Sequence, residues 1–534
     1  MKKVLILLVV FFFGTSNSHA QNSKTIEQRK PKIVVGMVVD QMRWDYLYKY
    51  RNRYGEGGFK RLIRDGFSCE NTMINYAPTV TAIGHSTVWT GSVPAITGIA
   101  GNDWYDREWG RSISNVEDST SKAVGAKSTF SKSPNNLLVT TIGDELRIAT
   151  NFQSKVVSVA IKDRASILPG GHAANGAFWN EDNKFVTSSF YMNELPDWVK
   201  EFNKTDWQKK LMPNGWNTLY PINTYTLSDK DDKDYENVFK GEDKPVFPHL
   251  KAGLTGTPFG STFTLEFAKR AIDGYGLGKG AFTDILAVSL SSPDGIGHQF
   301  GPTSIEIEDN YLRLDKDLED FFNFLDKKFG KDGYIYFITA DHGANQSPGF
   351  LEENKLPTGV VPGKMVETLN EVLNIQFGQP KLILANSNGQ LYLNYEEMEK
   401  GKIRRDVLVS VIAKELKKGK GIQNVFDNEK LAMATLPEPA KTMYINGYHS
   451  KRSGDIVVIK SAGWKNGSRM GATHGDWNPY DAHIPLVWMG KGIKPGKTNR
   501  SVGMTDIAPT VAAMLRVQMP SGCIGAVITE VAHQ

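Results

Sequence analysis

Two short motifs pair a carboxylate with an imidazole at spacings that suit a metal ion. Asp294 and His298 stand four residues apart, so one helical turn or a compact loop would direct both side chains at one ion. Asp341 and His342 are adjacent, and a carboxylate beside an imidazole suits a divalent metal such as zinc. These motifs predict a metal site.

Asp40 and His474 are further candidate ligands, although each also has an ordinary interpretation. Asp40 follows an apolar run, where a buried carboxylate is costly unless it is paired or bound to metal, but an Asp that begins a loop is often a cap. His474 lies in a glycine-flanked loop, where a histidine is usually solvated. Together the motifs offer enough ligands for two zinc ions if a nucleophile adds an oxygen, and such a pair suits phosphoryl transfer.

A hydroxyl nucleophile is available in residues 78–87, where Thr79 and Thr81 precede a predicted helix start. The free amides and the dipole of a helix N-terminus favour an alkoxide and an incoming phosphate. Thr81 could equally be a helix cap. The spacing alone does not decide between Thr79 and Thr81 as the nucleophile.

Five apolar runs alternate with helix-like segments, and this pattern predicts a parallel sheet covered on both faces. Four of them lead into the polar residues described above or into a cationic pair, Lys162 and Arg164. Because ligands bind at the carboxyl ends of the strands in such sheets, we expect these side chains to converge. The runs are residues 33–39, 156–161, 285–289, 334–339 and 484–489.

In their order along the chain, these motifs resemble the alkaline phosphatase superfamily, and within it the bacterial phosphate-irrepressible alkaline phosphatases of the PafA type. The resemblance implies an α/β fold, a three-layer α/β/α sandwich around a mostly parallel central sheet with surface insertions. The motifs that carry it are Asp40, Thr81 with His85, Asn102 in residues 101–105, Lys162 with Arg164, Asp294 with His298, Asp341 with His342, and His474 in residues 473–475.

The resemblance also assigns roles to these residues. It implies that Thr81, rather than Thr79, attacks phosphorus and is transiently phosphorylated, and that His85 has a structural role. The implied ligands of one zinc ion are Asp40, Thr81, Asp341 and His342, and those of the other are Asp294, His298 and His474. The implied phosphate contacts are Asn102, Lys162 and Arg164.

The cations at positions 162 and 164 favour phosphate monoesters, because a monoester carries one negative charge more than a diester. The first expectation is therefore a zinc phosphomonoesterase that serves in phosphate scavenging. The first alternative is a nucleotide pyrophosphatase or phosphodiesterase of the same superfamily. The second alternative is a non-catalytic exported protein that binds metal or phosphate. A sulfatase is disfavoured because the chain has no Cys-x-Pro-x-Arg run.

The composition is that of an ordinary globular protein, and the N-terminal segment predicts export. The chain has 534 residues, of which 40% are hydrophobic and 23% charged, and its net charge of +5 gives no indication of a nucleic-acid partner. Residues 1–20 combine two lysines, a ten-residue apolar run and a Ser-x-Ala end, which predicts a signal peptide. No later run reaches about 18 apolar residues, so we expect a periplasmic or secreted protein without a stable membrane anchor.

We expect one catalytic domain over residues 21–534, with insertions near residues 185–251 and 377–465. The expected partners are small-molecule phosphate monoesters, and the expected state is a monomer. Cys69 and Cys523 permit one disulfide in an oxidising compartment, although both could equally be buried thiols.

Overall fold

The computed structural model describes residues 30–127 and 131–532. The predicted signal peptide, residues 1–20, lies outside these residues. Over the described residues, no helix is both long and apolar enough to cross a membrane.

Most strands belong to one 11-stranded sheet, whose central five strands run parallel in the order β7-β6-β9-β1-β10. Four of the five, β6, β9, β1 and β10, are buried throughout, which explains why the sequence identified them, whereas β7 ends in the partly buried Asn180 and Glu181. The strands along the sheet are β17 (His483–Ile484), β2 (Phe67–Met73), β18 (Leu486–Gly490), β10 (Tyr334–Thr339), β1 (Ile33–Val39), β9 (Asp284–Leu290), β6 (Val156–Ala160), β7 (Gly176–Glu181), β8 (Lys184–Ser188) and β5 (Ala123–Val124), with β19 (Gly496–Gly503) paired to β2.

The fifth predicted run differs from the other four. Residues 484–489 divide at Pro485 between β17 and β18, and β18 pairs with β10 in the antiparallel direction. Proline has no backbone N–H to give to the ladder, which accounts for the break. The sheet is thus parallel at its centre and mixed at its edges, which agrees with the mostly parallel central sheet expected from the sequence.

The strand register sets the ends of the central strands at one level. Val39 of β1 pairs with Leu290 of β9, and Val38 pairs with Thr339 of β10. On the next strand, Ala160 of β6 pairs with Ser289. The residues that follow these four strands therefore emerge side by side at one edge of the sheet.

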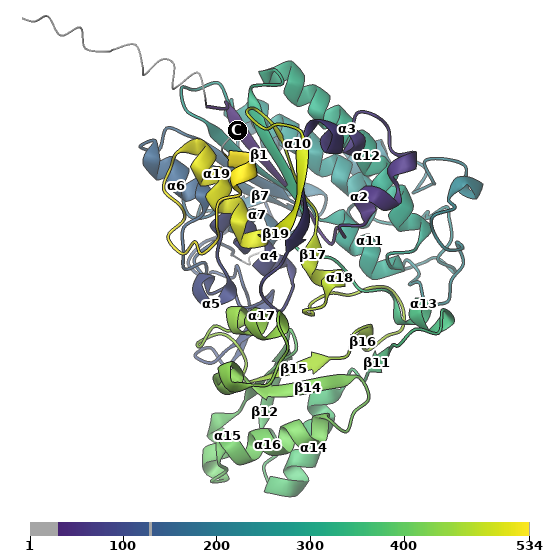
Figure 1. Cartoon of the computed structure of the whole chain (residues 1–534), viewed down its shortest axis with the longest axis vertical. Coiled ribbons are helices and arrows are strands. Elements are labelled where there is room, and N and C mark those ends of the chain that lie inside the picture. The colour runs from purple at the N-terminus through teal and green to yellow at the C-terminus, as the bar shows by residue number, and fades with distance from the viewer. Residues whose placement is uncertain (1–29, 128–130, 533–534) are drawn as a thin grey trace, which may run out of the picture. The chain divides into compact units, whose positions relative to one another are not determined.

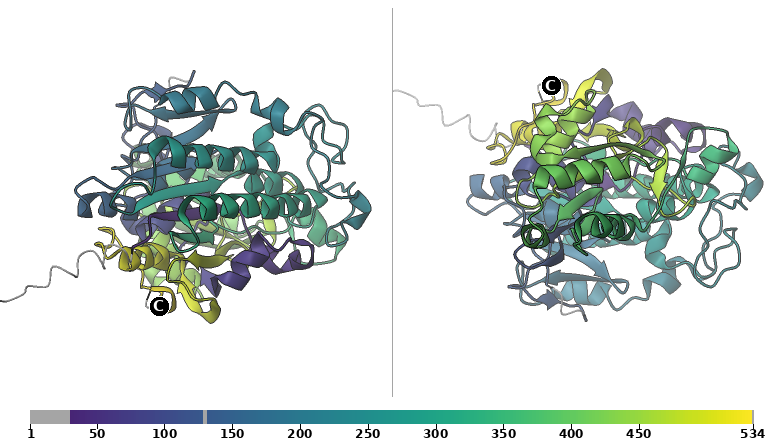
Figure 2. Two further views of the ribbon diagram at one scale, coloured as in Figure 1. Left: turned by 90° about the horizontal axis from the view of Figure 1, so that it is seen from above. Right: turned by 90° about the horizontal axis from the view of Figure 1, so that it is seen from below.

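Helices cover both faces of the central strands, as Figures 1 and 2 show. The helix α7 packs on β6, β7 and β9 and contacts α4, which contacts α19, while α10 packs on β6 and β9 and contacts α12. The helices are α4 (Thr81–Thr90), α7 (Asp163–Gly170), α10 (Phe259–Tyr275), α11 (Ser292–Phe300), α12 (Ile305–Phe329) and α19 (Ile507–Leu515).

A second, four-stranded sheet in the order β12-β13-β15-β14 lies within residues 383–460. With the helices α14 (Met365–Phe377) and α16 (Arg405–Leu416) it encloses its own hydrophobic cluster on one face, while Val457 and Ile459 on the other face of β15 belong to the core of the main sheet. Figure 1 shows it in green beyond the ends of the central strands. Its strands are β12 (Ile383–Ser387), β13 (Gln390–Leu393), β15 (Ile456–Lys460) and β14 (Ile422–Asp427).

The region near residues 185–251 contains two short helices, α8 (Asp197–Phe202) and α9 (Trp207–Leu211), and otherwise irregular backbone. The two cysteines are not joined to each other: Cys69 is buried in β2 and Cys523 is partly exposed, and both are free thiols.

Candidate functional site

A first group of metal-ligand side chains lies at the carboxyl ends of two neighbouring central strands, β1 and β10. Asp40 follows β1, and Asp341 and His342 follow β10 by two and three residues. All three are fully buried, and one ligand atom from each lies within 4.8 Å of the others. Gly84 of α4 permits this packing, because a Cβ there would stand 2.4 Å from the carbonyl oxygen of Asp341.

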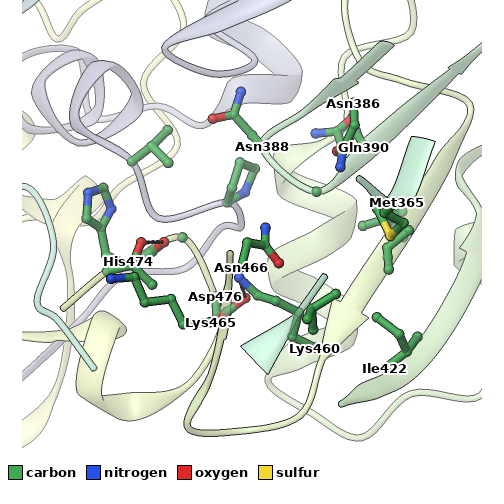
Figure 3. Close-up of a pocket in the computed structure, with 18 of the residues that line it drawn as sticks. Met365, Asn386, Asn388, Gln390, Ile422, Lys460, Lys465, Asn466, His474 and Asp476 are labelled. Atoms are coloured by element: carbon green, nitrogen blue, oxygen red, sulfur yellow. Dashed lines mark hydrogen bonds and ion pairs between the residues drawn. The ribbon is translucent and has the colours of Figure 1, made fainter. Parts of the chain in front are cut away.

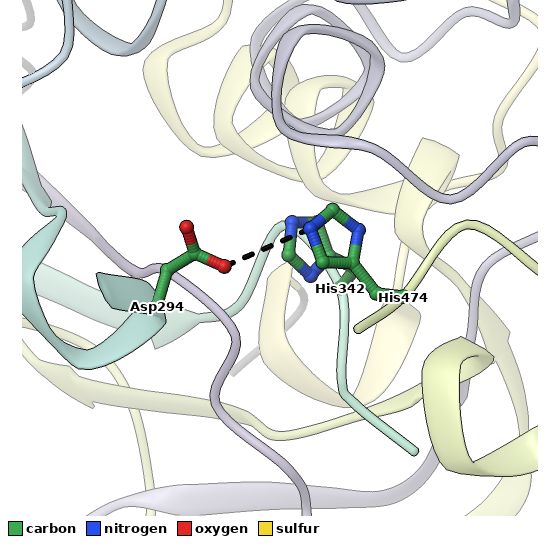
Figure 4. A group of neighbouring side chains, drawn as sticks. All are labelled: Asp294, His342 and His474. Atoms are coloured by element: carbon green, nitrogen blue, oxygen red, sulfur yellow. Dashed lines mark ion pairs between the residues drawn. The ribbon is translucent and has the colours of Figure 1, made fainter. Parts of the chain in front are cut away.

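A second group adjoins the first and consists of Asp294, His342 and His474 (Figure 4). Asp294 lies in the first turn of α11, and its Oδ1 is 3.7 Å from Nε2 of His474. The His342 and His474 rings stack at 3.5 Å between centroids. His298, the sequence-predicted partner, is outside this tight group, but its Nε2 is 3.1 Å from Oδ1 of Asp294.

Burial, together with the repulsion between its two carboxylates, favours the binding of a cation to the first group. Desolvation, followed by the charge of Asp341, raises the pKa of Asp40 well above its usual range. Desolvation likewise raises the pKa of Asp341 to about 7. Oδ1 of Asp40 and Oδ2 of Asp341 are buried without a hydrogen-bond partner. Carboxylate and imidazole donors with unpartnered oxygens fit a divalent metal such as zinc.

Lys162 is the cation that the chain itself supplies. Its Nζ lies 2.7 Å from Oδ2 of Asp40 and 2.6 Å from Oδ2 of Asp294, so it bridges the two groups. Although burial alone would raise the pKa of Asp294, the charges of Lys162 and His298 hold it well below its usual range. Lys162 occupies the N-cap position of α7, two residues after the end of β6, which is why the sequence places it at this edge.

The two candidate threonines have different surroundings. Thr81 is the first residue of α4 and its side chain does not cap the helix, so its hydroxyl is available to the site. Oγ1 of Thr81 lies 3.4 Å from Nε2 of His342 and 3.4 Å from Nζ of Lys162. Thr79, in contrast, donates from Oγ1 to the carbonyl oxygen of Asp476 (2.8 Å) and accepts from the amide of Gly475 (3.2 Å). The Thr79 hydroxyl therefore fixes the loop that carries His474.

The remaining sequence-predicted residues surround the start of α4. Oδ1 of Asn102 accepts from the backbone amide of Ala82, at 2.9 Å, which leaves its amide nitrogen as a donor. Arg164 stands two residues beyond Lys162, with its Nη1 at 3.7 Å from Oδ1 of Asp163. His85 is buried with Nε2 at 3.2 Å from the hydroxyl of Ser289.

Gln41 is a site residue that the sequence analysis did not single out. Its backbone N–H donates to Oδ1 of Asp341 (3.1 Å), and its side-chain Nε2 donates to Oδ1 of Asp294 (2.5 Å). Its φ of 63° is left-handed, a strained conformation for a residue other than glycine. Its position directly after Asp40 was the only sequence signal for it.

Asn345 is a second such residue. Its Oδ1 accepts from the amide of Thr473 (2.9 Å), and its own amide donates to the carbonyl of Thr473 (3.0 Å). It thereby joins the segment after β10 to the His474 loop. Nothing in the local sequence around Asn345 indicates this contact.

Comparisons with known proteins found a matching family, similar relatives and a similar solved structure. Residues 34–481 match the family described as type I phosphodiesterase / nucleotide pyrophosphatase. Alkaline phosphatase PhoV of Synechococcus elongatus is 50% identical over 547 residues, 99% of each chain, and alkaline phosphatase PafA of Elizabethkingia meningoseptica is 50% identical over 522 residues, 95% of this chain and 96% of the relative. A crystal structure of wild-type alkaline phosphatase PafA superimposes with a TM-score of 0.92 at 49% identity, covering 94% of this chain and 99% of that one.

Proposed function

The chain belongs to the type I phosphodiesterase / nucleotide pyrophosphatase family of the alkaline phosphatase superfamily, and we propose that it is a phosphomonoesterase, an alkaline phosphatase. The observation that carries this proposal is the bridging position of Lys162, 3.4 Å from the Thr81 hydroxyl and between two groups of metal-ligand side chains. A cation there favours the extra charge of a monoester.

We propose that two zinc ions complete the site. Asp40, Thr81, Asp341 and His342 would hold one ion, and Asp294, His298 and His474 the other. When bound, they supply Lewis-acid stabilisation of a deprotonated threonine and of the leaving oxygen.

The side chains of the protein divide the remaining work. The Thr81 hydroxyl loses its proton, and its Oγ forms a bond to phosphorus as the ester bond breaks and the alcohol oxygen takes up a proton. Water then attacks the phosphorus of the phosphothreonine, the bond from phosphorus to Oγ breaks, a proton from the water returns to Oγ of Thr81, and phosphate leaves. Asn102, Lys162 and Arg164 donate to the nonbridging oxygens, which gain charge in the transition state.

The family description also covers diesterases, which makes nucleotide pyrophosphatase activity the competing function. We do not favour it, because two relatives that share half of their residues with this chain, PhoV and PafA, are named alkaline phosphatases. We further propose that residues 1–20 are a cleaved signal peptide, that residues 21–534 are one catalytic domain with insertions near residues 185–251 and 377–465, and that the protein acts in phosphate scavenging outside the cytoplasm.

The test compares phenyl phosphate with methyl phenyl phosphate as substrates of the purified protein. We expect kcat/KM to be higher for the monoester, activity to disappear on chelation, and zinc to restore it. Thr81→Ala should abolish turnover while the metal content stays at the wild-type level. A preference for the diester would move the protein to the phosphodiesterase function, and full activity after complete metal removal would exclude the mechanism.

A further inference from the structure

A polar pocket borders the candidate site on the side of the four-stranded sheet (Figure 3). Its volume is about 240 Å³, and its lining includes His474 as well as Pro78 and Val80, which precede Thr81. Pockets for drug-sized ligands usually measure about 300–1,000 Å³. This pocket therefore suits a smaller group, about the size of one sugar ring, attached to a phosphate at Thr81.

Two lysines line the pocket together with one carboxylate, that of Asp476, so the lysines leave the lining a net positive charge. Lys460, at the end of β15, has its Nζ 3.5 Å from Oδ1 of Asp476. Lys465, in β16 (Trp464–Asn466), donates to backbone carbonyls, including that of Gly471 at 3.2 Å, and makes no ion pair with the described carboxylates. Desolvation lowers the pKa of Lys465 to about 8. An anionic ligand would restore to this ammonium the stabilisation that burial removes.

Carboxamides supply the hydrogen-bonding groups of the pocket. Asn386, Asn388, Gln390 and Asn466 all line it. The buried Gln390 is held in place because its Oε1 accepts from the backbone amide of Gly454 at 2.8 Å. A carboxamide both donates and accepts, so a row of them matches the hydroxyl groups of a sugar or polyol.

We propose that this pocket binds the alcohol portion of the substrate, and that this portion is a sugar or polyol carrying a second anionic group such as a carboxylate or phosphate. The inference rests on the proposed function, because it requires the ester phosphate to lie at Thr81. The lysines select the second anion, and the carboxamides select the hydroxyl groups. Neither lysine is among the residues proposed for metal binding or phosphoryl transfer.

The test uses two substrates that differ in one group, glucose 1-phosphate and glucuronic acid 1-phosphate. Turnover is measured as kcat/KM with the wild-type chain, and binding as Kd by calorimetry with Thr81→Ala. Lys460→Met and Lys465→Met remove the pocket charges, and Lys465→Arg retains the charge. Lys430→Met is the matched control, since Lys430 is an exposed lysine of the same region that does not line the pocket.

We expect glucuronic acid 1-phosphate to be preferred in both measurements, and each methionine variant to reduce that preference about tenfold, the lower range for a charge-assisted contact. Lys430→Met should leave the preference unchanged. Equal Kd values for the two compounds, or equal losses on both in Lys460→Met, would overturn the subsite while phosphomonoesterase activity persists. A retained difference in Kd without any turnover would instead refute the proposed function and support the subsite.

Discussion

Removing the charge of Lys162 should destabilise the metal-free protein far more than the zinc-loaded one. In the structure the Lys162 side chain is 20% exposed and its Nζ lies within 2.7 Å of two buried carboxylates, while a third, Asp341, is close by. Lys162→Met leaves these groups without a cation. Two zinc ions would neutralise the same carboxylates, so in the loaded state the lysine is no longer the only source of positive charge.

The magnitude follows from the burial of the partners. Removing one member of a buried ion pair costs about 3–5 kcal/mol, and the partial exposure of Lys162 favours the lower end. We therefore expect a loss of about 3 kcal/mol in the free energy of unfolding without metal, and about 1 kcal/mol with zinc. By thermodynamic linkage, the difference of about 2 kcal/mol corresponds to zinc binding that is about 30-fold tighter in Lys162→Met.

The assay is urea unfolding followed by tryptophan fluorescence, with and without zinc, together with zinc affinity measured by competition with a chelator. Lys269→Met is the control, because Lys269 is 18% exposed and also has two carboxylate partners, but it lies on α10 away from the site. Its loss should be at most about 1 kcal/mol in both states. Equal destabilisation of Lys162→Met in both states, or weaker zinc binding, would refute the reasoning.

Three further outcomes are expected. Arg164→Ala should lower kcat/KM for phenyl phosphate by about 10- to 150-fold and for methyl phenyl phosphate by less, whereas equal losses would assign Arg164 a structural role. Thr79→Val should loosen the His474 loop, so that activity falls but excess zinc restores it in a metal titration, and a loss that zinc does not restore would contradict this role. The hydrogen bond with Asp144 raises the pKa of His172 above its ordinary value, so this pair stabilises the fold fully below about pH 6.5 and less as the pH rises through the raised pKa. The free-energy difference between wild type and His172→Gln, a few tenths of a kcal/mol in urea unfolding, should therefore shrink between pH 6 and 9, and a constant difference would exclude the effect.

The central strands could be predicted because their residues are buried on both faces. The runs 33–39 and 334–339 coincide with β1 and β10, since a continuous apolar run has no polar residue within it to blur its ends. The direction of β18 could not be predicted, because an apolar run looks the same in either orientation. Its pairing with β10 is a property of the assembled sheet.

The candidate site was predictable where a ligand follows a strand, and not where a side chain reaches across the fold. Asp40 and Asp341 stand at strand ends, so the rule for open α/β sheets applies to them. The contacts of Gln41 and Asn345 depend on segments that lie 128 to 300 residues away along the chain. The distinction between the two threonines likewise emerged from the hydrogen bonds of Thr79 with the distant residues Gly475 and Asp476.

The four-stranded sheet has a consequence for how this enzyme can diversify. It has its own hydrophobic cluster and supplies a wall of the pocket, yet none of the proposed metal ligands or the nucleophile belongs to it. Mutations within this cluster can accumulate with little effect on the hydrolytic machinery, whereas Val457 and Ile459 of β15 belong to the core of the main sheet. Evolution, or a directed-evolution library confined to the pocket-lining residues of this sheet, could thus change which esters are accepted while the chemistry is retained.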